Sequence, residues 1–96
     1  MEATKEQIAK WKEEHGKLYC IKVDDKVCYL KKPTRKTMGY AMVAGKTNPI
    51  KFNEVLLKDC WLGGDEVIKT DDELFFSVSS KFGELVDTKE AELVEL

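Results

Sequence analysis

The first hydrophobic pattern along the chain is helical, because Ile8, Trp11 and His15 recur three or four residues apart. Thr4 precedes the pattern as a candidate N-cap, with a glutamine three residues later as in a capping box. Gly16 follows the pattern and is typical of a helix end. We expect an N-terminal helix with a thin apolar stripe that needs only one packing surface.

Two segments rich in β-branched and aromatic residues come next, KLYCIKV and VCYLKK. This composition predicts the two strands of a hairpin. With residues 24–26 as the loop, Ile21 would face Tyr29, and Cys20 would share a face with Cys28. Both faces are partly apolar, and a two-stranded ribbon is marginal alone. We therefore expect helices or a second chain to cover at least one face.

A second helical pattern follows Pro33, which ends the strand because it has no N–H to donate. Thr34 is placed to cap this helix, and Gly45 to end it. The apolar stripe of this helix consists of Met38, Ala41 and Met42.

The strongest helical pattern begins at Asn48, a candidate N-cap, with Pro49 at the first helical position. Gly63 and Gly64 are expected to end this helix, one of them with a positive φ. The helix is apolar around so much of its circumference that it should be central in the fold. Its apolar positions are Phe52, Val55, Leu56 and Cys60, widened by Ile50, Leu57, Trp61 and Leu62.

The last part of the chain, residues 70–96, has a helical pattern after an extended piece around Val67 and Ile68. Thr70 and Glu73 have the spacing of a capping box. Gly83 and the Asp87–Thr88 pair are where this helix can bend or divide. Its apolar side consists of Leu74, Val78, Phe82 and Leu85.

These elements predict an α+β fold in one domain, residues 1–96. Its expected order is an N-terminal helix, a β-hairpin and then a C-terminal bundle of three to four helices. With 43% hydrophobic and 35% charged residues the chain is globular rather than disordered. No apolar run approaches the roughly 20 residues of a membrane span, and the charged first residues lack the apolar core of a signal peptide. We expect no membrane association and a cytoplasmic location.

The stretch CWLGGDEV, residues 60–67, contains four letters of the GGDEF signature of enzymes that cyclise GTP. In those enzymes the motif lies at a turn between strands, in a domain much longer than this chain. Here the glycines follow a strong helical pattern, so we interpret the stretch as a helix end followed by acidic residues.

No catalytic or metal-binding constellation emerges from the remaining residues. Cys60 would need a base to act as a nucleophile, and the single histidine, His15, is expected at the surface. Cys60 lies instead on an apolar helix face, where cysteine acts as a small hydrophobic residue. The three cysteines form no CxxC pair, so we expect no metal, no cofactor and no enzymatic activity.

One basic cluster is present, and it defines the basic corner: Lys31, Lys32, Arg35 and Lys36. It could contact a phosphate or an acidic partner, or it could be a solvated corner between a strand and a helix. No aromatic residue lies between these cations, as binding of single strands would require. The formal charge of −2 also argues against nucleic acid as a ligand, and this role is kept as an alternative.

Residues 29–41, YLKKPTRKTMGYA, and residues 48–86, which begin NPIKFNEVLLKDCWLGGDEV, together resemble small proteins of the phage tail assembly chaperone type. In that group a hairpin leads through a Lys/Arg-Pro segment into a helix. A helix beginning (Asp/Asn)-Pro and ending in Cys-x-x-Gly-(x)-Asp follows, and one or two helices close the chain. The positions that carry the resemblance are Pro33, Pro49, Cys60, Gly64 and Asp65.

The resemblance implies a non-enzymatic role in the host cytoplasm, shielding a helix-rich tape measure protein until the tail tube forms around it. A long amphipathic protein aggregates unless its apolar stripes are covered, and a small helical domain can offer a groove for them. Phe75 and Phe76 are adjacent, so we expect one of them to be partly exposed or to cover a second surface. A homo-oligomer formed through the hairpin is also possible. The candidate partner-binding residues are Trp61, Leu62, Phe75, Phe76 and Met42.

Overall fold

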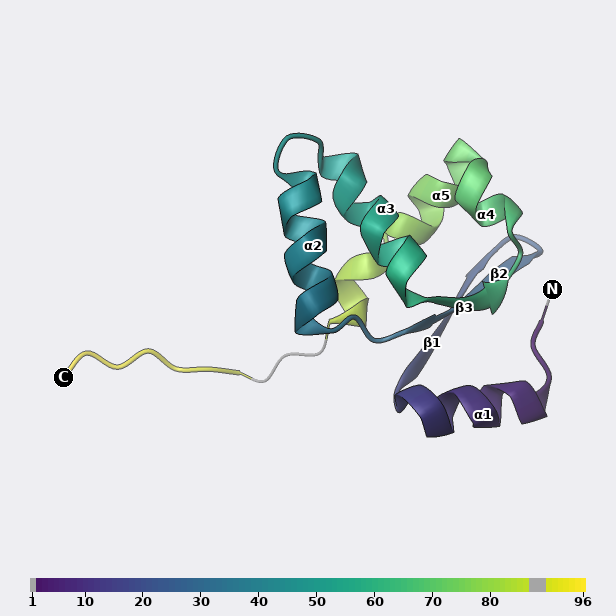
Figure 1. Ribbon diagram of the computed structural model, residues 1–96, viewed down its shortest axis with the longest axis horizontal. Coiled ribbons are helices and arrows are strands. Elements are labelled where there is room, and N and C mark those ends of the chain that lie inside the picture. The colour runs from purple at the N-terminus through teal and green to yellow at the C-terminus, as the bar shows by residue number, and fades with distance from the viewer. Residues whose placement is uncertain (1, 87–89) are drawn as a thin grey trace.

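A three-stranded antiparallel sheet separates the N-terminal helix from the other helices in the computed structural model, which describes residues 2–86 and 90–96 (Figure 1). Helix α1 (Lys5–His15) covers one face of the sheet. Helices α2 to α5 lie on the other side. This arrangement confirms the predicted α+β class, with an N-terminal helix, a hairpin and then several helices. No helix in the described residues is long and apolar enough to cross a membrane.

Helix α1 begins and ends where the sequence predicts. The Thr4 hydroxyl accepts a hydrogen bond from the Gln7 backbone N–H at 3.1 Å, which satisfies one of the free donors of the first turn. Gly16 closes the helix with a φ of 77°. None of its residues is buried, and its main contact with the sheet is Trp11, whose ring centroid lies 5.5 Å from that of Tyr29.

The hairpin of β1 (Leu18–Val23) and β2 (Lys26–Lys31) is confirmed, but its predicted register is wrong by one residue. The turn has two residues, Asp24 and Asp25, because a two-residue turn matches the twist of the strands and Asp24 adopts a φ of 53°. Ile21 therefore pairs with Cys28 rather than facing Tyr29.

A shift of one residue reverses the face on which every β2 side chain lies. Ile21, Cys28 and Leu30 point into the core together. Tyr29 points toward α1, where its hydroxyl accepts a hydrogen bond from the Ala3 backbone N–H at 3.1 Å. Cys20 is opposite Tyr29, so Cys20 and Cys28 lie on opposite faces, contrary to the prediction.

Helices α2 (Arg35–Gly45) and α3 (Pro49–Cys60) form an antiparallel helical hairpin (Figure 1). Both predicted caps are present. The Thr34 hydroxyl accepts from the Thr37 N–H and the Asn48 side-chain oxygen accepts from the Ile50 N–H, each at 3.1 Å. Of the expected stripe on α2, Ala41 is fully buried and Met38 packs against the core, whereas Met42 is exposed.

A third strand, β3 (Trp61–Gly64), was not predicted. It pairs antiparallel with β2, with Leu30 opposite Trp61 and Cys28 opposite Gly64. The prediction that Gly63 and Gly64 end the long helix is therefore wrong, because α3 already ends at Cys60. Gly64 does have a positive φ, 130°, and its backbone lies so close to Val27 that a side chain would not fit.

Asp65 follows β3 and fixes this strand to the hairpin. Its carboxylate accepts a hydrogen bond from the Val27 N–H at 2.9 Å, and its own N–H donates to the Val27 carbonyl at 2.9 Å. Asp65 of the Gly-Gly-Asp-Glu stretch thus continues the β2–β3 pairing.

The segment around Val67 and Ile68 is a helical turn, α4 (Val67–Thr70), rather than the extended piece predicted. The turn places Ile68 in the core with no exposed surface. Thr70 belongs to this turn, and its hydroxyl donates to the Val67 carbonyl at 3.3 Å. Asp71 therefore replaces Thr70 as the cap of α5 (Asp72–Ser79), accepting from the Leu74 N–H at 3.0 Å.

The predicted C-terminal helix is much shorter than expected, because α5 ends at Ser79 and a separate turn, η1 (Phe82–Leu85), follows. Gly83 was predicted to be a point of division, but it lies within η1, after the break between α5 and η1. Asp87 and Thr88 lie outside the described residues. Residues 90–96 are exposed and have no regular secondary structure, so the prediction of helix there is wrong.

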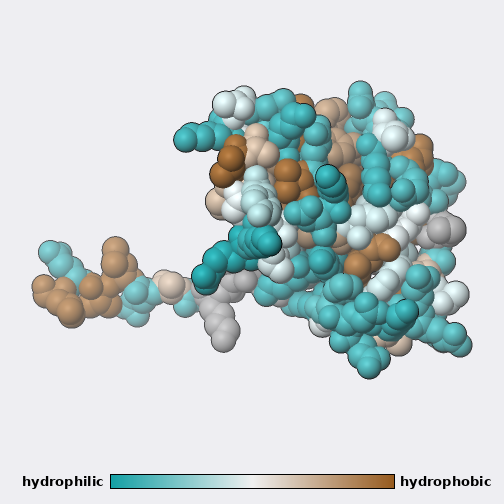
Figure 2. All heavy atoms as spheres, in the orientation of Figure 1, coloured by the Kyte–Doolittle hydropathy of each residue, from teal (hydrophilic) through white to brown (hydrophobic). Residues whose placement is uncertain are grey.

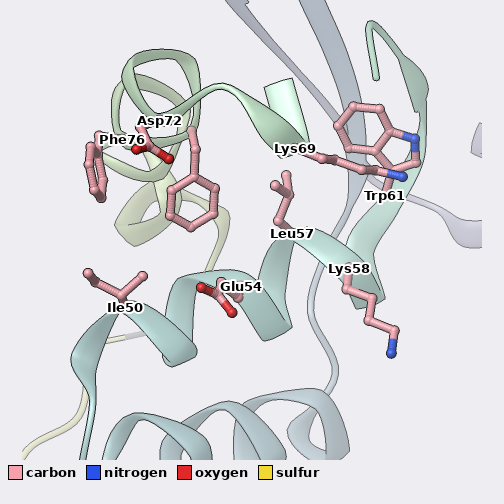
Figure 3. Close-up of a pocket in the computed structure, with 9 residues that line it drawn as sticks. Ile50, Glu54, Leu57, Lys58, Trp61, Lys69, Asp72 and Phe76 are labelled. Carbon is pink, nitrogen blue, oxygen red and sulfur yellow. The ribbon is translucent and has the colours of Figure 1, made fainter. Parts of the chain in front are cut away.

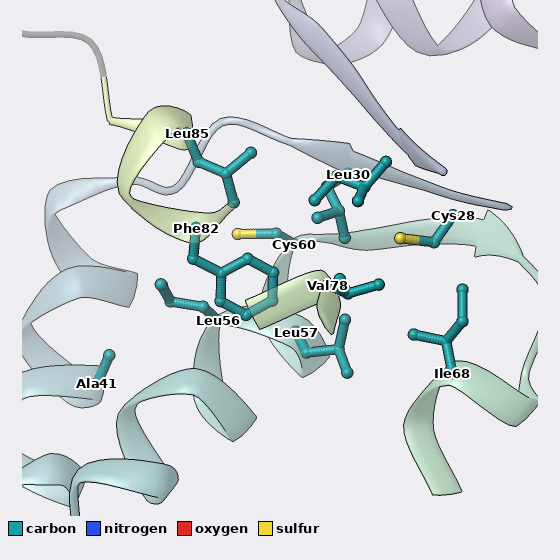
Figure 4. Close-up of a cluster of buried hydrophobic side chains, with 11 residues drawn as sticks. Cys28, Leu30, Ala41, Leu56, Leu57, Cys60, Ile68, Val78, Phe82 and Leu85 are labelled. Atoms are coloured by element: carbon teal, nitrogen blue, oxygen red, sulfur yellow. The ribbon is translucent and has the colours of Figure 1, made fainter. Parts of the chain in front are cut away.

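The core lies between the sheet and the helices, where side chains from every element after α1 meet (Figure 4). Leu56 and Cys60 of α3 pack beside Phe82 and Leu85 of η1, and Val78 lies near them. Of the apolar side predicted for the last helix, Val78, Phe82 and Leu85 are buried and Leu74 packs against the core. The side chains with no more than 2% exposure are Cys28, Leu30, Ala41, Leu56, Cys60, Ile68, Val78 and Leu85.

Candidate functional site

An open groove lies between α3 and the pair of helices α4 and α5 (Figure 3). Its volume is about 700 Å³, compared with about 240 and about 180 Å³ for two other cavities. Residues from α3 recur at helical spacing along its lower wall, and α5 and α4 supply the opposite wall. The lining residues are Ile50, Glu54, Leu57, Lys58, Trp61, Lys69, Asp72, Phe75 and Phe76.

One end of the groove is apolar and exposed. Phe76 is 53% exposed and Ile50 is 43% exposed, and they lie on opposite walls of this end (Figure 3). Phe75 packs against the core, with its ring centroid 5.6 Å from that of Phe76 in an edge-to-face arrangement. The prediction that one of the two adjacent phenylalanines is partly exposed is confirmed. Leu57 is almost fully buried and forms the floor between the two walls.

The other end of the groove combines an aromatic ring with cations. The Lys69 ammonium lies 4.3 Å from the centroid of the Trp61 ring, within the range of a cation–π contact. Lys69 also forms an ion pair with Glu66, with 3.2 Å between nitrogen and oxygen. Lys58, near the end of α3, also lines this end of the groove, and its ammonium points away from Trp61 and Lys69 (Figure 3).

Two carboxylates lie along the groove toward its apolar end. Glu54 is paired with Lys51 one turn earlier on α3, at 3.6 Å. Asp72 is in the first turn of α5, where a negative charge complements the helix dipole. The groove therefore has a neutral apolar floor, a cationic end at Trp61 and an acidic rim nearer to Phe76.

Three of the five predicted partner-binding residues, Trp61, Phe75 and Phe76, line this one groove. Leu62 does not, because alternate residues of a strand point to opposite faces. It borders a smaller cavity of about 180 Å³ beside Trp11 of α1. Met42 lies on α2, is 62% exposed and does not line the groove.

The charged lining residues were missed in the sequence, although a signal for them exists. Ile50, Glu54, Leu57 and Trp61 are spaced by three or four residues, which places them on one face of a helix. Asp72, Phe75 and Phe76 have the same spacing on α5. Only the packing of α5 opposite α3 turns these two faces into one groove.

The basic corner lies away from the groove, at the junction of β2 and α2. Lys31 ends β2 and is half-buried, whereas Lys32, Arg35 and Lys36 are exposed. The first turn of α2 carries no acidic residue, so its cations lie at the positive end of the helix.

Two of the three cysteines belong to the apolar core. Cys28 and Cys60 are fully buried, and burial raises the pKa of each thiol to about 11, so both stay protonated at neutral pH. Cys20 is exposed, and all three are free. His15 is at the surface, 3.9 Å from Glu14. Within residues 2–86 and 90–96, no group of three or more histidine, cysteine or acidic side chains could hold a metal ion.

Comparisons with models of protein families, with curated proteins and with solved structures give no significant match to this chain. The similarity to tail assembly chaperones therefore stays a prediction from the sequence pattern.

Proposed function

We propose that this protein is a non-enzymatic assembly factor of the tail chaperone type, which holds an amphipathic helix of a helix-rich tail protein in its α3–α5 groove. The tape measure protein is the partner that the sequence resemblance implies. The observation that carries the proposal is the exposed pair Phe76 and Ile50, which face each other across an open groove.

An amphipathic helix suits this groove for physical reasons. Helices that bind in grooves present apolar side chains at positions i, i+3, i+4 and i+7. Helices pack about 8–10 Å apart, so a partner helix lying over the groove can contact α3 on one side and α5 on the other. Trp61 and Phe76 stand at opposite ends of the groove, and large aromatic side chains are common among the few residues that contribute most of the affinity of a protein interface.

The charged residues of the groove differ between its two ends. Lys58 and Lys69 lie at the Trp61 end, and Asp72 and Glu54 lie nearer to Phe76. An incoming helix with acidic residues at one end and basic residues at the other would be held in one orientation. Complementary charge of this kind contributes to specificity more than to affinity.

The test is binding of a purified helix-rich tail protein by Phe76→Ala, with Val43→Ala as the matched control. Phe76 and Val43 are both exposed apolar residues in helices, but Val43 lies on α2 outside the groove. We expect Phe76→Ala to weaken binding roughly 30-fold, the effect of losing an aromatic anchor. Val43→Ala should bind like the unmodified chain. Unchanged binding by Phe76→Ala and by Trp61→Ala would show that the groove is not the binding site.

Nucleic-acid binding through the basic corner is the competing proposal, and the absence of acidic residues from the first turn of α2 favours it. Neutralising Lys31, Lys32, Arg35 and Lys36 together should then abolish a salt-sensitive shift of DNA or RNA in a gel. If the unmodified chain produces no shift at low salt, this alternative is removed.

A further inference from the structure

The two outer edges of the sheet differ in length and regularity. At one edge, β3 has four residues, and its pairing with β2 is interrupted between Tyr29 and Leu30. At the other edge, β1 pairs with β2 residue for residue along its whole length and contains no proline. Proteins commonly protect an edge strand by keeping it short or by interrupting it with a bulge or proline. Since β1 has none of these features, it is the edge better suited to further pairing.

The backbone groups of β1 that point outward can be assigned from its partner strand. Val27 lies opposite Lys22, but the Val27 N–H and C=O bond to Asp65, on the side away from β1. Lys22 and Val27 are therefore a pair without mutual hydrogen bonds, so the Lys22 backbone groups point outward. Alternation along the strand gives the same direction to Cys20 and Leu18. No other segment that the structure describes bonds to these outward groups.

A cleft of about 240 Å³ lies along this edge of β1. Residues 19–22 line it in succession. Because neighbouring residues of a strand point to opposite faces, a cavity that touches four in a row borders the backbone at the strand edge. The other wall of the cleft belongs to η1 and its approach, through Lys81, Glu84 and Leu85. The outward backbone groups of β1 therefore face open space.

The β1 strand of a second copy suits this edge. An antiparallel partner centred on Cys20 places Cys20 opposite its counterpart and Leu18 opposite Lys22, so all three outward residues gain backbone partners. Tyr19 then lies opposite Ile21, a favourable aromatic and β-branched pair on the face that packs against the core. Lys22 is the one charged residue in the sequence of β1, and this register keeps the two copies of it apart. A register centred on Lys22 would instead place like charges opposite each other.

We propose that β1 pairs antiparallel with β1 of a second copy about a twofold axis at Cys20, which joins the two sheets into one. No β1 residue lines the α3–α5 groove, so the dimer keeps both of its grooves open. A long partner with successive amphipathic helices would engage both grooves and be held more tightly than by one. The dimer itself does not depend on the proposed function.

Sedimentation equilibrium of the purified chain tests the dimer. The unmodified chain should dimerise as its concentration rises. Cys20→Pro removes an outward N–H, and an edge strand tolerates proline where the missing N–H faces outward. The variant should raise the dimer dissociation constant roughly tenfold or more, because two backbone hydrogen bonds across the axis are lost. Circular dichroism checks that the variant is folded.

The control addresses another surface that could associate. Exposed apolar side chains also gather over α2 and α3 (Figure 2), and Val43 of α2 is among them. Val43→Asp would disrupt a dimer formed through that surface but leaves β1 unchanged. It should therefore dimerise like the unmodified chain. If Val43→Asp abolishes the dimer and Cys20→Pro does not, the proposal is wrong.

Cys20 is also a native reporter of the register, because its side chain is exposed. Opposite residues in a hydrogen-bonded pair have Cα atoms about 5.5 Å apart, within the range of a disulfide. Diamide, which takes two electrons and two protons from two thiols, should link Cys20 to its counterpart, whereas Cys28 and Cys60 are buried. Lys10→Cys in a Cys20→Ser chain gives the rate of random collision for an exposed thiol on α1. Cys20 should react roughly tenfold faster or more, since pairing raises its effective concentration.

Two further cysteine variants test the remaining pairs, Leu18→Cys and Lys22→Cys, each combined with Cys20→Ser. Neither should link readily to itself, but their mixture should form the mixed disulfide, because position 18 lies opposite position 22. If Cys20→Pro does not fold, Leu18→Lys and Leu18→Glu replace it. The first opposes two lysines and should weaken the dimer, whereas the second opposes a glutamate and a lysine and should not.

Three results would each overturn the proposal. They are a chain that stays monomeric at every concentration, a Cys20 thiol that links no faster than the α1 control, and a mixture that links no faster than its components. Failure to bind a tail protein would overturn only the proposed function, because these tests contain no tail protein.

Discussion

At the scale of single residues, Gly64 combines a positive φ with a backbone neighbour so close that no side chain fits. A Cβ atom there would lie 2.6 Å from the Cys28 Cα and closer still to the Val27 carbonyl oxygen, and the φ of 130° is unfavourable for any residue except glycine. Asp65 then adds two hydrogen bonds to Val27. These neighbours explain why Gly63 and Gly64 belong to a strand and why Asp65 follows them.

Gly64→Ala is accordingly expected to lower the free energy of unfolding by about 3 kcal/mol, through backbone strain and the displacement of β3 from β2. The measurement is urea denaturation. Gly83→Ala is the control, because nothing lies within 4 Å of the added methyl group, and its effect should stay within about 1 kcal/mol. Equal stability of the two variants would contradict this account of the β2–β3 junction.

At the scale of elements, α1 is the helix most weakly held by the fold. None of its residues is buried, and Trp11 provides its main contact, against Tyr29 and against Gly63. A side chain at position 63 would place its Cβ 2.9 Å from the Trp11 ring, so the indole lies directly on the strand. The helix can therefore separate from the sheet without opening the core on the opposite face.

Trp11→Ala should release α1 while the core stays folded. Hydrogen exchange of the α1 backbone amides should become fast, whereas the amides of α3 and β2 should keep their protection. We expect a loss of roughly 1–2 kcal/mol in stability, less than for a fully buried tryptophan. Lys10→Ala on the exposed side of the same helix should leave exchange unchanged. Loss of protection throughout the chain would show that α1 is part of the core.

At the scale of the whole molecule, one apolar core joins the sheet to the helices, and it contains two thiols. Cys28 and Cys60 have no exposed surface, and burial raises the pKa of each from 9.0 to about 11. The unfolded chain therefore loses these protons at a lower pH than the folded chain. Stability from the two thiols is fully present below pH 9 and falls as the pH rises from about 9 to about 11.

Urea denaturation at about pH 8 and about pH 10 measures this effect. Each thiol should contribute about 1 kcal/mol to the decrease in the free energy of unfolding between these two values. The variant with Cys28→Ala and Cys60→Ala should show a decrease smaller by the sum of the two contributions. A decrease of the same size in both chains would mean that the thiols are not desolvated.

The groove is the feature that depends most on how the helices pack in the tertiary structure. The sequence placed Trp61 on the long helix and Phe75 and Phe76 on the last one, and it identified all three as candidate anchors. It could not separate them from Leu62, which the pleat of β3 turns toward α1, or from Met42, which lies on another helix. Which apolar residues share a surface depends on how α5 packs opposite α3.

The sequence by itself determined the elements whose signals are local. The caps at Thr4, Thr34 and Asn48 and the helices that they begin depend on side chains within three residues of each cap, so the predictions for them are confirmed. The core role of Cys60 also followed from periodicity along one helix.

Only the tertiary structure decided the rest, because it depends on residues far apart in the chain. The strand β3 exists because Trp61 and Gly64 meet β2 more than 30 residues earlier, and no local pattern shows that pairing. Asp65 is bonded to Val27, 38 residues away. The helical pattern of residues 90–96 is local but insufficient, since a short helix without packing is unstable in water. Pairing and burial between distant residues decided these features, and the periodicity of one sequence carries no information about such contacts.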